Sequence, residues 1–179
     1  MTLEGGCDCR AVRYRMESAP LFVHCCHCRW CQRETGASFA LNALIESELL
    51  TTLAERPELV DTPSQSGMGQ KIARCRNCRI ALWSHYAGAG PILSFVRVGT
   101  LDVPDELPPD IHIFTASKQP WVVIPPGMRA VPEYYDREKY WPREASSAGR
   151  RCWRRNELRA LHAGRGRGAE PARLCATRQ

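Results

Sequence analysis

The sequence has no apolar run long enough to cross a membrane. Its most apolar stretch, residues 92–98, contains Ser94 and Arg97 and falls far short of the roughly 20 residues that a spanning helix needs. Charged side chains are spread through the first 17 residues, which leaves no room for the apolar segment of a signal peptide. These absences predict a cytoplasmic protein without a membrane span.

Helical periodicity is almost absent as well, and we find no internal repeat. Apolar and polar residues instead alternate over short segments bounded by glycine or proline, as in half-buried strands. One helix is expected over residues 28–34, closed by Gly36 as its C-terminal cap. The sequence thus predicts a mainly β fold with few short helices. Strands are expected at residues 10–17, 21–24, 38–45, 49–53, 58–61, 70–74, 80–86, 92–98, 110–115 and 121–124.

Length and charge divide the chain into one domain and a tail. A chain of 179 residues with 44% hydrophobic residues is large enough for one core. The net charge of +6 is uneven, because residues 143–179 hold ten arginines against three glutamates and the remainder is nearly neutral. That segment is also rich in glycine and alanine, so it cannot bury enough apolar surface to offset its ordering entropy. We predict a domain over residues 1–142 and a basic, mostly disordered tail over 143–179.

Cysteine is the residue whose pattern carries most information. Eight of the ten cysteines fall in the first 78 residues, and seven of these form three short clusters. In a chain without a targeting signal, such clusters indicate metal binding or redox chemistry, whereas disulfides usually tie distant segments. The clusters are Cys7-x-Cys9, Cys26-x-Cys28-x-x-Cys31 and Cys75-x-x-Cys78.

The first and third clusters together supply four thiolates. Residues two apart on a strand face the same way, and a CxxC pair brings two sulfurs together at a tight turn. Four thiolates on one divalent ion favour zinc in a closed, structural site. We predict that Cys7, Cys9, Cys75 and Cys78 hold this zinc, which would join the first strand to a distant hairpin. Arg79 follows the last pair, where a glycine often eases the turn.

The middle cluster supplies three thiolates and leaves a fourth position. Cys26 and Cys28 leave a strand, and Cys31 lies one helical turn further on, so the three sulfurs converge. An open position on zinc can bind an incoming thiol as a thiolate or polarise a carbonyl oxygen. We therefore predict that this second zinc is catalytic.

The neighbours of the middle cluster leave an alternative. His24 shares a face with Cys26 and could serve as a fourth ligand, which would make the second zinc structural too. His27 lies between two ligands and should point away. Cys25 adjoins Cys26, and adjacent side chains on an extended chain point apart. We interpret Cys25 as a small buried residue, with a redox-sensitive thiol as the alternative.

Four segments together resemble one known family. Residues 5–14, 24–36, 75–78 and 115–121, the last containing Ser117-Lys-Gln-Pro-Trp121, are similar to the glutathione-dependent formaldehyde-activating family, also called the centromere-protein-V/GFA domain. The similarity runs from about Leu3 to Pro142.

The resemblance implies a fold, two zinc ions and a reaction. The fold is a β-tent of small antiparallel sheets around zinc. It implies a structural zinc on Cys7, Cys9, Cys75 and Cys78 and a catalytic zinc on Cys26, Cys28 and Cys31. The family reaction joins glutathione to formaldehyde as S-(hydroxymethyl)glutathione and is classed as a carbon–sulfur lyase. The implied partners are thus a small thiol such as glutathione and a small carbonyl.

Two further hypotheses come from other classes of protein. In the first, zinc stabilises a binding module whose basic tail engages nucleic acid or another polyanion. The tail lacks interleaved aromatics apart from Trp153, which disfavours this reading. In the second, the CxxC pairs carry redox chemistry, but the expected βαβ context is absent. Lys118, Arg29 and Arg33 could bind substrate carboxylates, although ordinary surface charge is the simpler interpretation.

Overall fold

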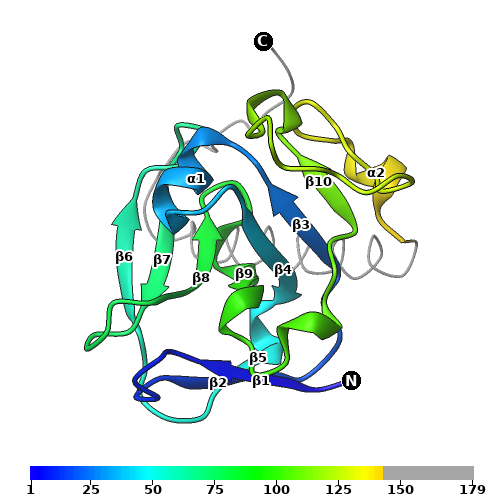
Figure 1. The fold of residues 1–179 in the computed structure, drawn as a ribbon. Coiled ribbons are helices and arrows are strands. Elements are labelled where there is room, and N and C mark those ends of the chain that lie inside the picture. Colours follow the sequence, from blue (N-terminus) through cyan, green and yellow to red (C-terminus); the bar gives the residue numbers. More distant parts are fainter. Residues whose placement is uncertain (143–179) are drawn as a thin grey trace, which may run out of the picture.

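A seven-stranded sheet and a three-stranded sheet form the framework of the protein (Figure 1). The computed structural model describes residues 1–142. The small sheet has the order β1-β2-β5 and lies across one end of the large sheet, at the bottom of Figure 1. Its strands are β1 (Leu3–Gly6), β2 (Arg13–Met16) and β5 (Leu50–Thr52).

The large sheet has the order β10-β3-β4-β9-β8-β7-β6. Every neighbouring pair is antiparallel except β10 and β3, which are parallel. Its strands, in chain order, are β3 (Phe22–Cys26), β4 (Ala40–Glu46), β6 (Glu58–Thr62), β7 (Gln70–Arg74), β8 (Ala81–Tyr86), β9 (Leu93–Arg97) and β10 (Ile111–Ile113).

The helices are short. Helix α1 spans Arg29–Thr35 and lies at the end of the large sheet opposite the small one (Figure 1), and α2 spans Arg137–Tyr140 beside β10. Single 3-10 turns occupy Ser47–Leu49, Gly90–Ile92, Val98–Thr100, Pro104–Glu106 and Thr115–Ser117. Among the described residues, no helix is both long and apolar enough to span a membrane.

The mainly β prediction is confirmed, with three differences. Strand β1 was not predicted, because residues 3–6 carry two glycines and too few apolar side chains to show alternation. Strand β10 pairs in parallel with β3, so the sheets are not wholly antiparallel. The strand expected at 121–124 was wrong: Pro120, Pro125 and Pro126 flank that segment and cannot donate backbone hydrogen bonds, and the segment forms a turn and irregular chain. The tail over 143–179 lies outside the described residues.

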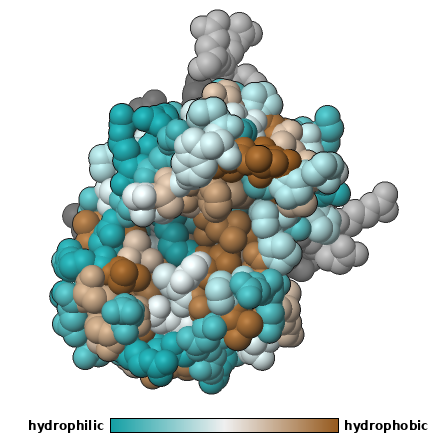
Figure 2. Space-filling model, in the orientation of Figure 1, coloured by the Kyte–Doolittle hydropathy of each residue, from teal (hydrophilic) through white to brown (hydrophobic). Residues whose placement is uncertain are grey.

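Alternation along β3 and β4 separates two apolar clusters. One cluster fills the space between the small sheet and one face of the large sheet, and includes Tyr14, Val23, Ala43 and Val96. The other cluster covers the opposite face. Its buried members are Phe22, Cys26, Cys28, Cys31, Ala40, Leu44, Ile111, Ile113, Tyr135 and Trp141. Figure 2 shows apolar residues reaching the surface in the middle of the molecule, where β3, β4 and β10 lie in Figure 1.

Gly5 gives a direct test of how β1 packs. A Cβ atom added to Gly5 would lie 2.5 Å from the Thr100 carbonyl oxygen and 2.6 Å from the Tyr14 hydroxyl oxygen. We expect Gly5→Ala to lower the free energy of unfolding by about 1–3 kcal/mol or more, because the buried Tyr14 ring and the backbone cannot both move aside. Urea denaturation of the whole chain measures this.

The matched control is Gly99→Ala. No atom lies within 4 Å of a Cβ added there, and the change should stay within about 0.5 kcal/mol. Equal urea midpoints for the two variants would contradict the packing of β1 described above.

Candidate metal centres

Cys7, Cys9, Cys75 and Cys78 converge, as the sequence predicts. Their sulfurs all lie within 4.8 Å of one another, although 66 residues separate Cys9 from Cys75. The Cys7–Cys9 and Cys9–Cys75 sulfur distances are 3.5 and 3.6 Å. Four sulfurs around one zinc at about 2.3 Å would be ~3.8 Å apart, so the arrangement fits a tetrahedral ion.

Two tight turns present these four sulfurs. The turn between β1 and β2 is closed by a hydrogen bond from the Cys7 amide to the Val12 carbonyl at 3.1 Å. The turn between β7 and β8 is closed by one from the Cys75 amide to the Ile80 carbonyl at 3.0 Å. The zinc predicted here would therefore connect the small sheet with the large one.

Each turn contains an arginine whose backbone is in the left-handed conformation. Arg10 has φ 61° and Arg79 has φ 63°. Both follow a cysteine pair at positions where glycine would be unstrained. Arg79 therefore adopts the backbone conformation that the missing glycine would supply, and its guanidinium pairs with Glu58 at 2.7 Å.

Cys26, Cys28 and Cys31 form the second group of sulfurs, also within 4.8 Å of one another. Cys28 is the N-cap of α1, and its sulfur accepts a hydrogen bond from the Cys31 amide at 3.3 Å. Gly36 ends the same helix in the left-handed conformation, as predicted. All three cysteines are buried, in contrast to the first group, in which Cys9 is exposed.

Both groups contain a thiol that ionises readily. Hydrogen bonds from Cys26 and Cys31 lower the pKa of Cys28 to about 3, while the pKa of Cys26 is raised. Backbone amides of Cys9 and Ile80 lower the pKa of Cys78 to about 6. Because metal ions bind the thiolate form, these environments suit thiolate ligands. The eight cysteines within the described residues are all free thiols, so none is held in a disulfide.

His24 does not join the three cysteines. Its Nε2 atom is hydrogen-bonded to the Tyr135 hydroxyl, whose oxygen also accepts a hydrogen bond from Trp141 Nε1 at 2.6 Å. An indole nitrogen can only donate, which fixes the direction of the bond from Trp141. Burial lowers the pKa of His24 to about 3, so its ring is neutral at pH 7. With Nε2 hydrogen-bonded to Tyr135 and the ring outside the group of three sulfurs, this arrangement gives no support to His24 as the fourth zinc ligand.

A third group, Cys25, His27 and His112, lies on the other face of β3. His112 is in register with Cys25 on the parallel strand β10. The Cys25 sulfur lies 3.6 Å from His27 Nε2, which lies 2.9 Å from His112 Nδ1. The two rings are nearly parallel, with their planes at 19°. This is an imidazole pair joined by a hydrogen bond, and one of the two facing nitrogens carries the hydrogen.

Sequence reasoning placed His27 away from the middle cluster but missed its partner. The signal was present in the alternation of the middle segment, since Cys25 and His27 must share a face. Only the parallel pairing with β10 brings His112 to them.

Of the three cations considered for substrate binding, Lys118 and Arg29 have hydrogen-bond partners within the chain. Lys118 Nζ donates to the backbone carbonyls of Gln119 and Val122, at 3.1 and 2.6 Å. Arg29 donates to the Gln32 side chain at 2.8 Å. Lys118 thus stabilises its own loop, beside an exposed Trp121.

Residues 2–117 match the sequence profile of a family described as glutathione-dependent formaldehyde-activating enzyme. The chain belongs to this family. The match confirms the resemblance drawn from the cysteine motifs, and it includes all seven clustered cysteines. Tyr135 and Trp141, which hold His24, lie beyond the matched residues.

Two known proteins are similar to this chain. One is from Halomonas elongata, with the provisional name of a glutathione-dependent formaldehyde-activating enzyme; it is 28% identical over 129 residues, which is 69% of this chain and 82% of that protein. The other is a Rhodobacter sphaeroides protein of known crystal structure, 22% identical, covering 55% of this chain and 87% of that one with a TM-score of 0.41. A structural likeness at that level adds nothing to the assignment.

Removing one sulfur from the four-cysteine group tests its structural role. We expect Cys75→Ser to lose one metal equivalent and to lower the free energy of unfolding by more than about 5 kcal/mol, which would unfold a domain of ordinary stability. The reason is that a zinc bound there would join two sheets that are distant in sequence. Circular dichroism and metal analysis of the purified protein measure both effects.

The comparison variant is Cys28→Ser, which removes a sulfur from the other group and should stay folded. A folded Cys75→Ser protein that still holds two metal ions would show that the four-cysteine group has no structural metal.

Proposed function

We propose that this protein catalyses the reversible addition of a small thiol, glutathione or a similar molecule, to formaldehyde or a similar small carbonyl. In the reverse direction the enzyme is a carbon–sulfur lyase. Two zinc ions are proposed, a structural one on the four-cysteine group and a catalytic one on Cys26, Cys28 and Cys31. We propose the cytoplasm as its location, because free thiols persist as metal ligands in a reducing compartment.

The observation that carries the proposal is the incomplete ligand set of the second group. Within the described residues, three buried sulfurs converge there, and neither His24 nor another cysteine, histidine or carboxylate joins them within 4.8 Å. Three protein ligands with a fourth position free are typical of catalytic zinc. Family membership supports the thiol and carbonyl as substrates.

The residues around this group suit a reaction between two small molecules. When bound, zinc would supply a Lewis acid that favours the thiolate form of a thiol. The surrounding cluster, with Phe22, Leu44 and Ile113, is apolar and excludes water from the sulfurs. The Cys31 amide holds the Cys28 sulfur in place at the start of α1.

The chemistry balances without an oxidant or a reductant. In the synthetic direction, the thiol sulfur forms a bond to the carbonyl carbon, and the carbonyl π electrons move to oxygen. That oxygen takes up the proton that the thiol loses, which gives a hydroxymethyl thioether. Holding both reactants in one water-poor site would supply much of the rate.

The alternative function, a binding module with a basic tail, depends on residues 143–179. These lie outside the described residues, and no contact within residues 1–142 favours it.

Replacing Cys28 tests the proposed activity. We expect Cys28→Ser to lose at least about 1000-fold in turnover of glutathione and formaldehyde, in line with the loss of a catalytic metal ligand, while the fold and one zinc equivalent remain. The readouts are formation of the hydroxymethyl adduct by NMR, circular dichroism and metal analysis.

The matched control is Cys25→Ala, which changes the neighbouring cysteine on the opposite face of β3 and should keep both zinc ions and most of the activity. Unchanged turnover in Cys28→Ser, or loss of both zinc ions, would overturn the assignment of the second centre.

A further inference from the structure

Arg97 is a buried cation without an acidic partner among the described residues. It lies at the end of β9 and is only 7% exposed. Its guanidinium donates to the side-chain oxygens of Asn42 and Ser84, both neutral, and its Nε atom has no hydrogen-bond partner within residues 1–142. Arg97 takes part in none of the ion pairs found within residues 1–142. Since an unpaired buried charge is costly, Arg97 calls for a nearby negative charge.

The register of the large sheet places Arg97 on the same face as the second cysteine group. Arg97 is paired with Asn42, Asn42 with His24, and Ala40 with Cys26. Paired residues on neighbouring strands point to the same face, as do residues two apart on one strand. Arg97 and Cys26 therefore face the same side of the sheet, one row apart.

Charge balance then connects Arg97 with the proposed zinc. Three thiolates and one divalent cation carry one net negative charge, and the Arg97 guanidinium carries one positive charge. In a low-dielectric interior, such a pair is far more stable than either charge alone.

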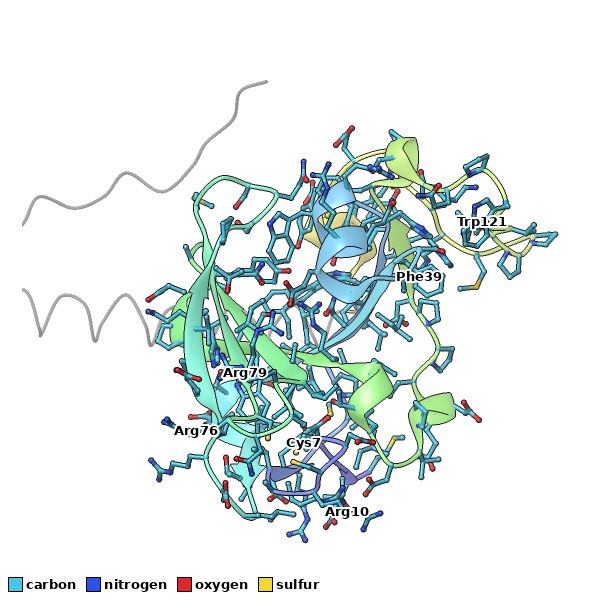
Figure 3. All side chains as sticks on the ribbon, turned by 60° about the vertical axis from the view of Figure 1, so that its left-hand side comes forward. Cys7, Arg10, Phe39, Arg76, Arg79 and Trp121 are labelled. Atoms are coloured by element: carbon cyan, nitrogen blue, oxygen red, sulfur yellow. The ribbon has the colours of Figure 1, made fainter. Side chains whose placement is uncertain are left out.

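The four-cysteine group would also carry a net negative charge with zinc bound, but it is partly open to solvent. Four thiolates and zinc carry two negative charges, but Cys9 is exposed to solvent. Figure 3 shows Cys7 with Arg10, Arg76 and Arg79 around it, and all three arginines are exposed. Water reaches that group through Cys9 and exposed arginines lie nearby, whereas the buried group faces one fixed arginine.

We propose that Arg97 is a positioning residue that supplies the buried counter-charge for the Cys26–Cys28–Cys31 metal centre, so that this centre retains its ion in an apolar site. The proposal rests on the second zinc centre of the proposed function. It assigns Arg97 no contact with the reacting atoms.

A competing role for Arg97 is recognition of a substrate carboxylate. A cavity of about 680 Å³ is lined by Arg97 together with Arg74 and Arg79. Arg74 is already paired with Glu34, and Arg79 with Glu58. In this role, Arg97 would affect the KM of an anionic thiol but would not affect retention of the metal.

The test measures zinc release to a chromogenic chelator from the full-length protein, with neither thiol substrate nor carbonyl present. Arg97→Met removes the charge and keeps much of the volume. We expect it to release the zinc of the three-cysteine centre about 10- to 100-fold faster than the unchanged protein does, the range typical of residues that support metal ligands. The zinc of the four-cysteine group should leave at an unchanged rate.

Two further variants separate charge from hydrogen bonding. Arg97→Lys keeps the charge and should release zinc more slowly than Arg97→Met. Arg15→Met removes one positive charge from an exposed pair with Glu4 and should match the unchanged protein. If Arg97→Met releases zinc at the unchanged rate, or if Arg97→Lys is as fast as Arg97→Met, the proposal is wrong. Unchanged release combined with a higher KM for glutathione would assign Arg97 to substrate binding instead.

If Arg97→Met does not fold, Arg97→Lys and Asn42→Ala decide the question, since both keep the charge and lose hydrogen bonds. Slow release from both supports the proposal, and fast release from either one overturns it. Failure of the proposed function would give a different result: the protein without substitutions would retain two zinc ions but would form no thiol adduct.

Discussion

The alternation of side chains along β3 and the two residues after it is the constraint on which the rest of the structure depends. It directs His24 and Cys26 to one face of the large sheet and Cys25 and His27 to the other. On the first face, α1 brings Cys31 back toward Cys26 and Cys28. On the second, β10 supplies His112. One short segment thus carries two unrelated clusters, and its backbone is held on both sides by β10 and β4.

Ligand number and burial together distinguish the two groups of sulfurs. In the four-cysteine group Cys7 and Cys75 are buried, but Cys9 is exposed, so solvent can reach that group. All three sulfurs of the other group lie in an apolar cluster, where a charge needs a fixed partner. This difference supports the division of roles that we propose, since a wholly buried and incomplete ligand set leaves a position for substrate and excludes water, whereas a complete set leaves no such position.

The sequence was most informative about features formed by residues close together along the chain. Spacing of two or three residues predicted which cysteines would group, and the Gly36 cap predicted where α1 ends. It was less informative where partners come from distant strands. His112 and Arg97 gave no signal of their partners, because the pairing of β10 with β3 and of β9 with β4 depends on the whole sheet. The proline-flanked segment at 121–124 was misread because its apolar side chains resemble those of a strand.

By itself the sequence determined the mainly β fold, the family and the grouping of seven cysteines, because strand alternation and chelating spacings are properties of neighbouring residues. The tertiary structure alone decided that His24 bonds to Tyr135 and that Arg97 is buried on the face of the second cysteine group. Both depend on burial and on contacts between distant segments, which cannot be read from spacing along the chain.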